Sequence, residues 1–202
     1  MKNEINFFND LNNNIIGVDE VGKGSWSGPV VACSVLLDKK ILHTEIFHKI
    51  NDSKKLNKRQ RTHFSKVIRK NSVYGFGVIS SKIIDEVGIQ KATELAMKIS
   101  LKKFSNVNKK IRIDGKKFFS VEKEFEFLIK GDQKSISIAS ASILAKDYRD
   151  KIMESLSKRF PGYDWEHNSG YGTSKHIVGL KKLGVCYEHR KSYKPIKKLL
   201  NR

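Results

Sequence analysis

Two adjacent carboxylates, Asp19 and Glu20, end an apolar run and are separated by one residue from the glycine-rich segment 22–24. β-branched residues at 15–21 and 30–37 predict two strands joined as a hairpin. Since side chains on a strand point to alternate faces, Asp19 and Glu20 cannot both enter one core, and at least one faces solvent, a cation or a ligand. Acids for a metal ion beside glycine amides for an anion would suit phosphate chemistry.

Two further carboxylates follow predicted strands. Asp114 comes at the end of the run 111–115, and Asp132 follows the run 125–129. Taken singly, each could cap a helix or form a turn. Residues just past strand ends gather at one edge of an α/β sheet, where four acids would repel one another unless hard divalent cations bind between them. The sequence therefore predicts a metal site at this edge.

The remaining pattern predicts further strands and helices. Asn57 is expected to be the N-cap of a basic helix, and Ser81 to cap a short helix that ends at Val87. The other elements are a strand over 72–80 and helices over 89–104, 135–160 and 175–183.

Two segments near the end of the longest helix carry separate expectations. The aromatic and glycine residues of 163–176 predict a loop that no core requires. Asp150 could be a fifth polar contributor to the site, but the simpler expectation is a surface turn of the helix, with a partner such as Arg149 or Lys151. The segment 189–198 is basic with an interleaved tyrosine, which suits contact with phosphates.

The length of 202 residues fits one ordinary domain, or one domain plus a short appendage. No apolar run is long enough to cross a bilayer, and the N-terminus lacks the apolar centre of a signal peptide. Cys33 and Cys186 form no metal-binding motif and suggest a reducing compartment. We therefore expect a soluble, cytoplasmic protein, and a monomer.

The formal net charge is +19, from 40 Lys and Arg against 21 Asp and Glu. Such an excess points to a polyanionic partner, and nucleic acid is the expected one. The chain is also rich in Asn and Ile, as expected of a protein from an A+T-rich genome. Charge alone therefore does not establish nucleic-acid binding.

A nucleotide-binding loop is an alternative reading of the same glycine-rich segment. Gly17, Gly22 and Lys23 match part of a P-loop, but Gly24 stands where a Ser or Thr hydroxyl should reach magnesium. A P-loop also opens directly into a helix, whereas a strand is predicted after Pro29. An NTPase is therefore disfavoured.

The complete set of motifs resembles ribonuclease HII, the bacterial type 2 ribonuclease H, from about residue 15 to 195. The matching motifs lie at 17–24, 28–32, 51–56, 113–115, 130–132, 141–150, 170–173 and 189–195. The resemblance implies an α/β, ribonuclease H-like fold, with a central mixed β-sheet flanked by helices and a helical C-terminal extension. The whole chain would be a single catalytic domain, with a core over about 15–160 and a helical, substrate-binding part over about 161–202. It favours HII over ribonuclease HIII, which adds a large N-terminal domain.

The resemblance also implies the residues of the site. Catalytic, metal-binding carboxylates would be Asp19, Glu20, Asp114 and Asp132, with Mn²⁺ or Mg²⁺ as the cofactor. In the family, the loop that is here Gly22, Lys23 and Gly24 senses the ribose 2′-hydroxyl at an RNA–DNA junction together with the tyrosine that is here Tyr171. Ser53 and Lys54 would contact the substrate backbone. Lys23 departs from the arginine that most members carry, so a guanidinium-specific contact would be lost.

The implied activity is hydrolysis of the RNA strand of RNA–DNA hybrids and cleavage 5′ of ribonucleotides embedded in duplex DNA. A two-metal mechanism would leave 5′-phosphate and 3′-hydroxyl ends, and would serve ribonucleotide removal in DNA replication and repair. A protein that binds nucleic acid without cutting it is the alternative from another class, which cleavage of a ribonucleotide-containing duplex would exclude.

Overall fold

The computed structural model describes residues 7–201, without the side chains of 51–54. A five-stranded sheet, in the order β3-β2-β1-β4-β5, forms its centre. The strands are β1 (Ile16–Val21), β2 (Val30–Leu37), β3 (Ser72–Ile79), β4 (Ile111–Asp114) and β5 (Phe125–Leu128). Strand β2 is antiparallel to both β1 and β3, whereas β4 is parallel to both β1 and β5. The predicted mixed sheet is confirmed.

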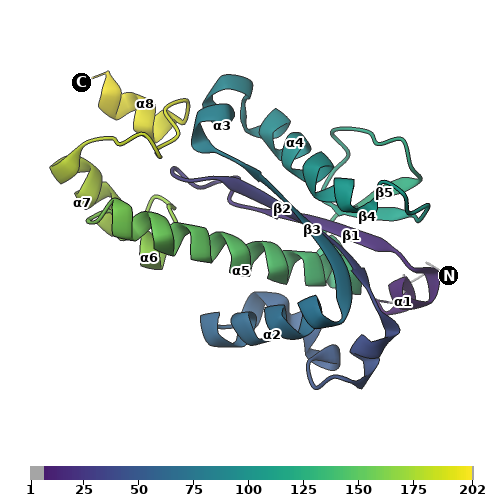
Figure 1. Cartoon of the computed structure of the whole chain (residues 1–202). Coiled ribbons are helices and arrows are strands. Elements are labelled where there is room, and N and C mark those ends of the chain that lie inside the picture. Colours follow the sequence, from purple (N-terminus) through teal and green to yellow (C-terminus); the bar gives the residue numbers. More distant parts are fainter. Residues whose placement is uncertain (1–6, 202) are drawn as a thin grey trace.

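Helices cover both faces of this sheet (Figure 1). The α-helices are α1 (Asn9–Asn13), α2 (Lys58–Lys70), α3 (Ser81–Val87), α4 (Ile89–Leu101), α5 (Ile136–Arg159), α6 (Trp165–Asn168), α7 (Ser174–Leu183) and α8 (Lys194–Leu200). Short 3₁₀ helices are η1 (Lys39–His43), η2 (Phe47–Lys55), η3 (Lys102–Phe104) and η4 (Gly131–Gln133). Helix α4 packs on one face, α5 with α2 on the other, and α6 to α8 gather at one end (Figure 1). Within residues 7–201, no helix is long and apolar enough to cross a membrane.

The alternation of side chains along β1 divides the interior into two cores. Ile16 and Val18 belong to the core on the α4 side, and Gly17 faces α5. A Cβ at Gly17 would lie 2.1 Å from the carbonyl carbon of Ser137, so strand and helix are in direct backbone contact here. By the same alternation Asp19 faces α5 and Glu20 faces the opposite side, as predicted.

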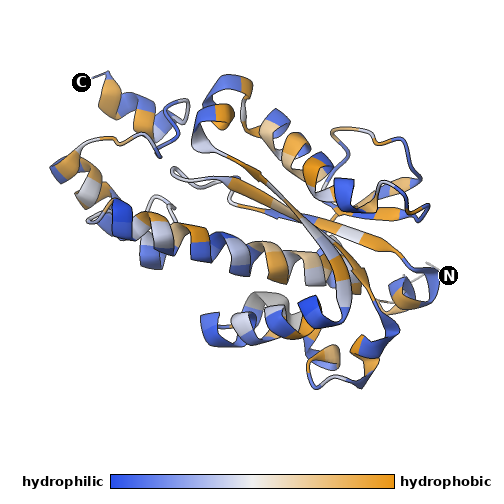
Figure 2. Cartoon of the chain, viewed as in Figure 1, coloured by the Kyte–Doolittle hydropathy of each residue, from blue (hydrophilic) through white to orange (hydrophobic). Residues whose placement is uncertain are grey.

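Helix α2 has the local features that its sequence predicts. The Asn57 side chain accepts a hydrogen bond from the Gln60 N–H, and the Gln60 side chain accepts one from the Asn57 N–H, which completes a capping box. Phe64 and Ile68 are buried against the α5 side of the sheet. Most of the remaining surface of α2 is hydrophilic (Figure 2).

Two local predictions are wrong. The N-cap of α3 is Ser80, whose hydroxyl accepts from the Ile83 N–H, while Ser81 is the first helical residue. The segment 163–176 takes part in a hydrophobic core, because Tyr163 and Trp165 are buried with residues of α5, α7 and α8. These rings give the C-terminal helices a hydrophobic core of their own, which a loop-like composition conceals.

The expectation for Asp150 is also wrong. Its carboxylate accepts hydrogen bonds from Lys146 at 2.6 Å, from Arg61 at 3.3 Å and from the Ser169 hydroxyl at 3.0 Å. Arg149 is fully buried, and its guanidinium binds backbone carbonyls and the Ser25 hydroxyl. Adjacent residues on a helix do not face each other, so the partner of Asp150 comes from one turn away or from another element.

Candidate active site

The predicted carboxylates come to one edge of the sheet. Asp19 on β1 and Asp114 at the end of β4 lie on adjacent parallel strands, since Val18 pairs with Ile113. Asp132 lies on η4, directly after β5, and is buried. The backbone N–H of Gly131 donates to Asp114 Oδ1 at 2.6 Å, which joins η4 to the end of β4.

Burial and mutual repulsion dominate the electrostatics of this edge. The pKa of Asp19 is raised well above its usual value, first by burial and then by the charges of Glu20 and Asp114. Hydrogen bonds from Ser142 and from the Glu20 N–H, at 2.7 Å, act in the opposite direction. Burial also raises the pKa of Glu20, although its Oε1 forms an ion pair with Lys23 Nζ at 2.6 Å.

These acids form an open arrangement that fits a hard cation. Within the described part of the chain, no three of them have ligand atoms within 4.8 Å of one another. Glu20 Oε2 is buried and accepts no hydrogen bond from any described residue. Such an orphaned oxygen, in a group of repelling carboxylates, fits a divalent ion that prefers oxygen ligands. The residues that would hold it are Asp19, Glu20, Asp114 and Asp132.

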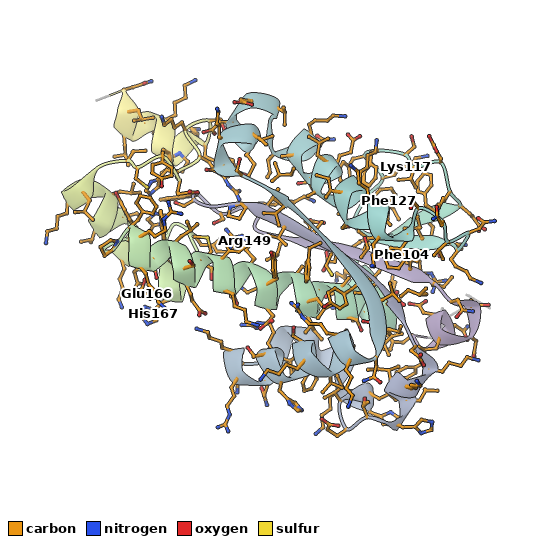
Figure 3. All side chains as sticks on the ribbon, viewed as in Figure 1. Phe104, Lys117, Phe127, Arg149, Glu166 and His167 are labelled. Carbon is orange, nitrogen blue, oxygen red and sulfur yellow. The ribbon has the colours of Figure 1, made fainter. Side chains whose placement is uncertain are left out.

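Another group of potential ligands meets the 4.8 Å spacing but is a surface cluster. It consists of Asp164, Glu166 and His167 on and beside α6. His167 Nδ1 lies 2.7 Å from Asp164 Oδ1, and Lys175 Nζ lies 3.7 Å from the same oxygen. Glu166 and His167 are exposed on the outer side of the helix (Figure 3). Its partners already satisfy this cluster without an ion.

The glycine-rich segment and Tyr171, far apart in sequence, lie side by side. Gly22 has φ of +92°, and a Cβ there would lie 2.2 Å from Arg149 Nε, so only glycine fits. Gly24 is exposed, and a Cβ there would lie 3.8 Å from Cε1 of the Tyr171 ring. Tyr171 is 38% exposed. The structure therefore brings a ring with a hydroxyl next to a backbone that carries no side chain.

Lys23 links this segment to the acids. Besides its ion pair with Glu20, its Nζ lies over the Phe118 ring, 5.3 Å from the centroid. Together with Gly24, Phe118 and the start of α4, it lines a cavity of about 450 Å³. The three-residue spacing of Glu20 and Lys23 is a sequence signal that could have indicated the ion pair.

Arg149 is a residue of this region whose place sequence reasoning missed. Its guanidinium donates to the carbonyls of Pro29 at 2.8 Å, Ser169 at 2.9 Å and Ser27 at 3.1 Å, and to the Ser25 hydroxyl at 2.9 Å. None of these acceptors is charged. Burial lowers the pKa of Arg149 to about 10. Figure 3 shows Arg149 on α5, where the helix faces the sheet, and its bonds tie the glycine-rich segment to the loop before Tyr171.

Two sequence readings have different outcomes. Ser53 and Lys54 lie in η2, but their side chains are outside those that the structure describes, so their contact with substrate stays a prediction. The P-loop alternative is wrong, because the chain after the glycine-rich segment forms β2 and not a helix.

Comparison with solved structures gives the class of the fold. The chain superposes on the ribonuclease HII of Archaeoglobus fulgidus, solved in complex with PCNA, with a TM-score of 0.76 and 22% identity over 92% of this chain and 96% of that one. It superposes on Bst-RNase HIII in complex with Mn²⁺ with a TM-score of 0.74 and 19% identity, over 93% and 69% of the two chains. The fold is that of the type 2 ribonucleases H.

Sequence comparison then identifies the family. The family model for ribonuclease HII matches residues 16–196. Ribonuclease HII of Pelagibacter ubique is 44% identical over 92% of this chain and 98% of its own length. That of Staphylococcus saprophyticus is 43% identical over 93% of this chain and 72% of its own. The chain belongs to the ribonuclease HII family, which cleaves the RNA of RNA–DNA hybrids.

Proposed function

We propose that this enzyme also cuts duplex DNA on the 5′ side of a single embedded ribonucleotide, leaving 5′-phosphate and 3′-hydroxyl ends. The observation that carries the proposal is that Gly24 lies against the Tyr171 ring. The residue before it, Lys23, forms an ion pair with Glu20, so this contact lies beside the acidic site. A ribose hydroxyl displayed in the minor groove can be detected by a hydrogen-bonding group that approaches it closely. Removal of ribonucleotides during DNA replication and repair would follow from this activity.

The catalytic residues in this proposal are Asp19, Glu20, Asp114 and Asp132, which would hold two divalent ions, Mg²⁺ or Mn²⁺. Such ions supply an activated water and stabilise the leaving 3′-oxygen. The orphaned oxygen of Glu20 and the raised pKa of Asp19 support this role, because both groups lack sufficient positive charge in the protein alone.

Recognition of the ribose is assigned to Gly22, Lys23, Gly24 and Tyr171. The glycines leave backbone amides accessible, and Tyr171 offers a hydroxyl and an aromatic face. The Lys23 side chain is already bound to Glu20, so its contribution is to the charge of the acidic site. Ser53 and Lys54 are proposed to contact the substrate backbone, and the net charge of +19 favours any such duplex.

The test is cleavage of a DNA duplex with one ribonucleotide, in Mg²⁺ and separately in Mn²⁺, beside an all-DNA duplex and a long RNA–DNA hybrid. The expected result is one cut 5′ of the ribose that requires metal and is absent from all-DNA. Cleavage of the hybrid alone would overturn the recognition role of Gly24 and Tyr171. Binding without cleavage of either substrate would contradict the catalytic assignment.

A further inference from the structure

The carbonyl oxygen of Lys23 is held by two side chains from the C-terminal segment. Arg190 Nη1 donates to it at 3.0 Å, and the Tyr193 hydroxyl donates to it at 2.5 Å. The same Tyr193 hydroxyl accepts a hydrogen bond from Arg190 Nη1 at 2.9 Å. The three groups form a closed triangle, directly behind the segment that is proposed to read the ribose.

Arg190 also fixes the other end of this turn. Its Nε and Nη2 donate to the Gly28 carbonyl at 3.0 and 2.9 Å. Its own N–H donates to the Trp26 carbonyl at 2.8 Å. The Arg190 side chain is fully buried, and burial lowers its pKa. A buried cation that binds backbone carbonyls at both ends of the turn leaves that turn little freedom to change shape.

Tyr193 is held in place independently of the turn. The carboxylate of Asp85, on α3, accepts from the N–H groups of Lys191 and Ser192, both at 2.8 Å, and from the Ser192 hydroxyl at 2.6 Å. The segment that carries Tyr193 is therefore anchored to α3, and its hydroxyl meets the Lys23 carbonyl from a fixed position.

The direction of the Lys23 carbonyl determines the direction of the next N–H group. In a trans peptide the C=O and N–H bonds point in opposite directions, and the described chain contains no cis peptide bond. With the Lys23 carbonyl turned toward Arg190 and Tyr193, the Gly24 N–H points away from them. No described residue accepts a hydrogen bond from it, and Gly24 lies beside Tyr171.

We propose that Tyr193 and Arg190 are positioning residues that orient the Lys23–Gly24 peptide, so that the Gly24 N–H is presented to the 2′-hydroxyl oxygen of the ribose. This inference rests on the proposed function and adds to it two residues that touch no substrate. In the described structure, neither Tyr193 nor Arg190 contacts a carboxylate of the active site. Substitution of either residue can therefore change ribose selectivity without changing the acids directly.

The experiment compares Tyr193→Phe with wild type and with Tyr187→Phe. The first substitution removes one hydrogen bond to the Lys23 carbonyl and keeps the ring, whereas the Tyr187 hydroxyl is exposed and contacts only Arg159 among the described side chains. Binding to the single-ribonucleotide duplex and to the all-DNA duplex is measured by fluorescence anisotropy in EDTA, where no cleavage occurs. Thermal melting of each variant is recorded alongside.

In Tyr193→Phe the preference for the ribonucleotide duplex is expected to fall about fivefold, the effect of losing one hydrogen bond of ordinary strength. The affinity for all-DNA should be unchanged, and Tyr187→Phe should keep the wild-type preference. An equal loss on both duplexes, or an unchanged preference, would overturn the inference. If the wild-type protein neither prefers the ribonucleotide duplex over all-DNA nor cuts at the ribonucleotide, the proposed function itself is wrong. That outcome is read from the wild-type protein alone, so it is distinct from a failure of the inference.

Discussion

The acidic edge of the sheet and the glycine-rich turn beside it are built in opposite ways. At the acidic edge, carboxylates repel one another, and Glu20 keeps a buried oxygen without a hydrogen-bond donor among the described residues. In the turn, the carbonyls of residues 23, 27, 28 and 29 accept hydrogen bonds from buried arginines. Under the proposed function, the turn is preorganised for the ribose, whereas the acids need a cation to complete them.

The difference follows from what each region must do. A surface that distinguishes a hydroxyl from a hydrogen needs its donors fixed before the ligand arrives, because flexible groups would lose affinity on ordering. A metal site gains its affinity from the charges that the protein leaves uncompensated. In the turn, the hydrogen bonds that stabilise the fold would also fix the donors for the ligand. At the acids, the uncompensated charges that would bind a metal ion destabilise the fold.

Replacement of Asp19 by Asn should produce the largest effect and separate the two regions most clearly. Cleavage should fall by about 10³-fold or more, because several kcal/mol of metal-based stabilisation is lost. Stability at pH 7 should not fall, since the substitution removes a buried, repelled carboxylate whose pKa is raised in the folded state. Gel assays of cleavage and thermal melting check both parts. A destabilised Asn variant would contradict the description of the acids as buried and mutually repelling.

Replacement of Arg149 by Met should have the converse effect on stability. Loss of the guanidinium removes the donor to the Pro29 carbonyl and leaves the carbonyls of Ser27 and Ser169 to share the single Ser25 hydroxyl, at a cost of about 3 kcal/mol or more. The melting temperature should fall by roughly 6–12 °C for a chain of this size. The control is Arg159→Met, at the last residue of the same helix, whose partner Tyr187 is exposed. Equal melting temperatures for the two variants would show that Arg149 does not stabilise the turn.

The two regions also differ in how far the sequence reveals them. The strand pattern and the acids at strand ends are local signals, and they predicted β1, β2, α2 and the gathering of the carboxylates. Most of the carbonyls that bind Arg149 and Arg190 are more than a hundred residues away, and an arginine in a basic chain gives no sign of burial. The sequence also failed to predict the core around Trp165, because aromatic residues in a glycine-containing loop show no periodicity. Long-range polar contacts are the part of this fold that local pattern does not encode.

Addition of Mg²⁺ should stabilise the acidic edge without affecting the turn. Binding to the folded state alone contributes about 2.7 kcal/mol at a concentration one hundred times the Kd. The melting temperature of wild type should therefore rise with Mg²⁺, and that of Asp19→Asn should not. Asp164→Asn is the control, because it removes a ligand from the surface cluster near α6. A shift that disappears in Asp164→Asn and persists in Asp19→Asn would place the ion at that cluster.

The smallest effect concerns a buried histidine pair behind Tyr171. His176 Nδ1 lies 3.0 Å from the Tyr171 carbonyl, and its Nε2 accepts from Trp165 Nε1 at 3.1 Å. His189 Nε2 lies 3.1 Å from the same His176 nitrogen, while its Nδ1 accepts from the Cys186 N–H at 3.0 Å. The network assigns the Nδ1 proton of His176 to the Tyr171 carbonyl and the Nε2 proton of His189 to His176, so both rings are neutral.

Acid should therefore weaken the support of Tyr171. Burial lowers the pKa of both histidines, that of His189 to about 4, with repulsion from His176 as the next cause. Because these folded-state values lie below the ordinary one of about 6.5, the contribution to stability is complete above pH 6.5. It is lost as the pH falls toward 4, by at most about 1.4 kcal/mol per pH unit for each proton taken up.

The pH profile of unfolding in denaturant, without metal, measures this loss. Asp19, whose pKa is raised in the folded state, shifts the profile in the opposite direction, so the measurement belongs in the Asp19→Asn background. There, His189→Gln should reduce the slope between pH 6.5 and 4.5, since Gln can accept from Cys186 and donate to His176 without titrating. His167→Gln, at an exposed histidine, is the control for the loss of an imidazole. If His189→Gln also leaves it unchanged, the buried pair does not control the acid sensitivity, and the rigidity behind Tyr171 comes from Arg149 and the aromatic core alone.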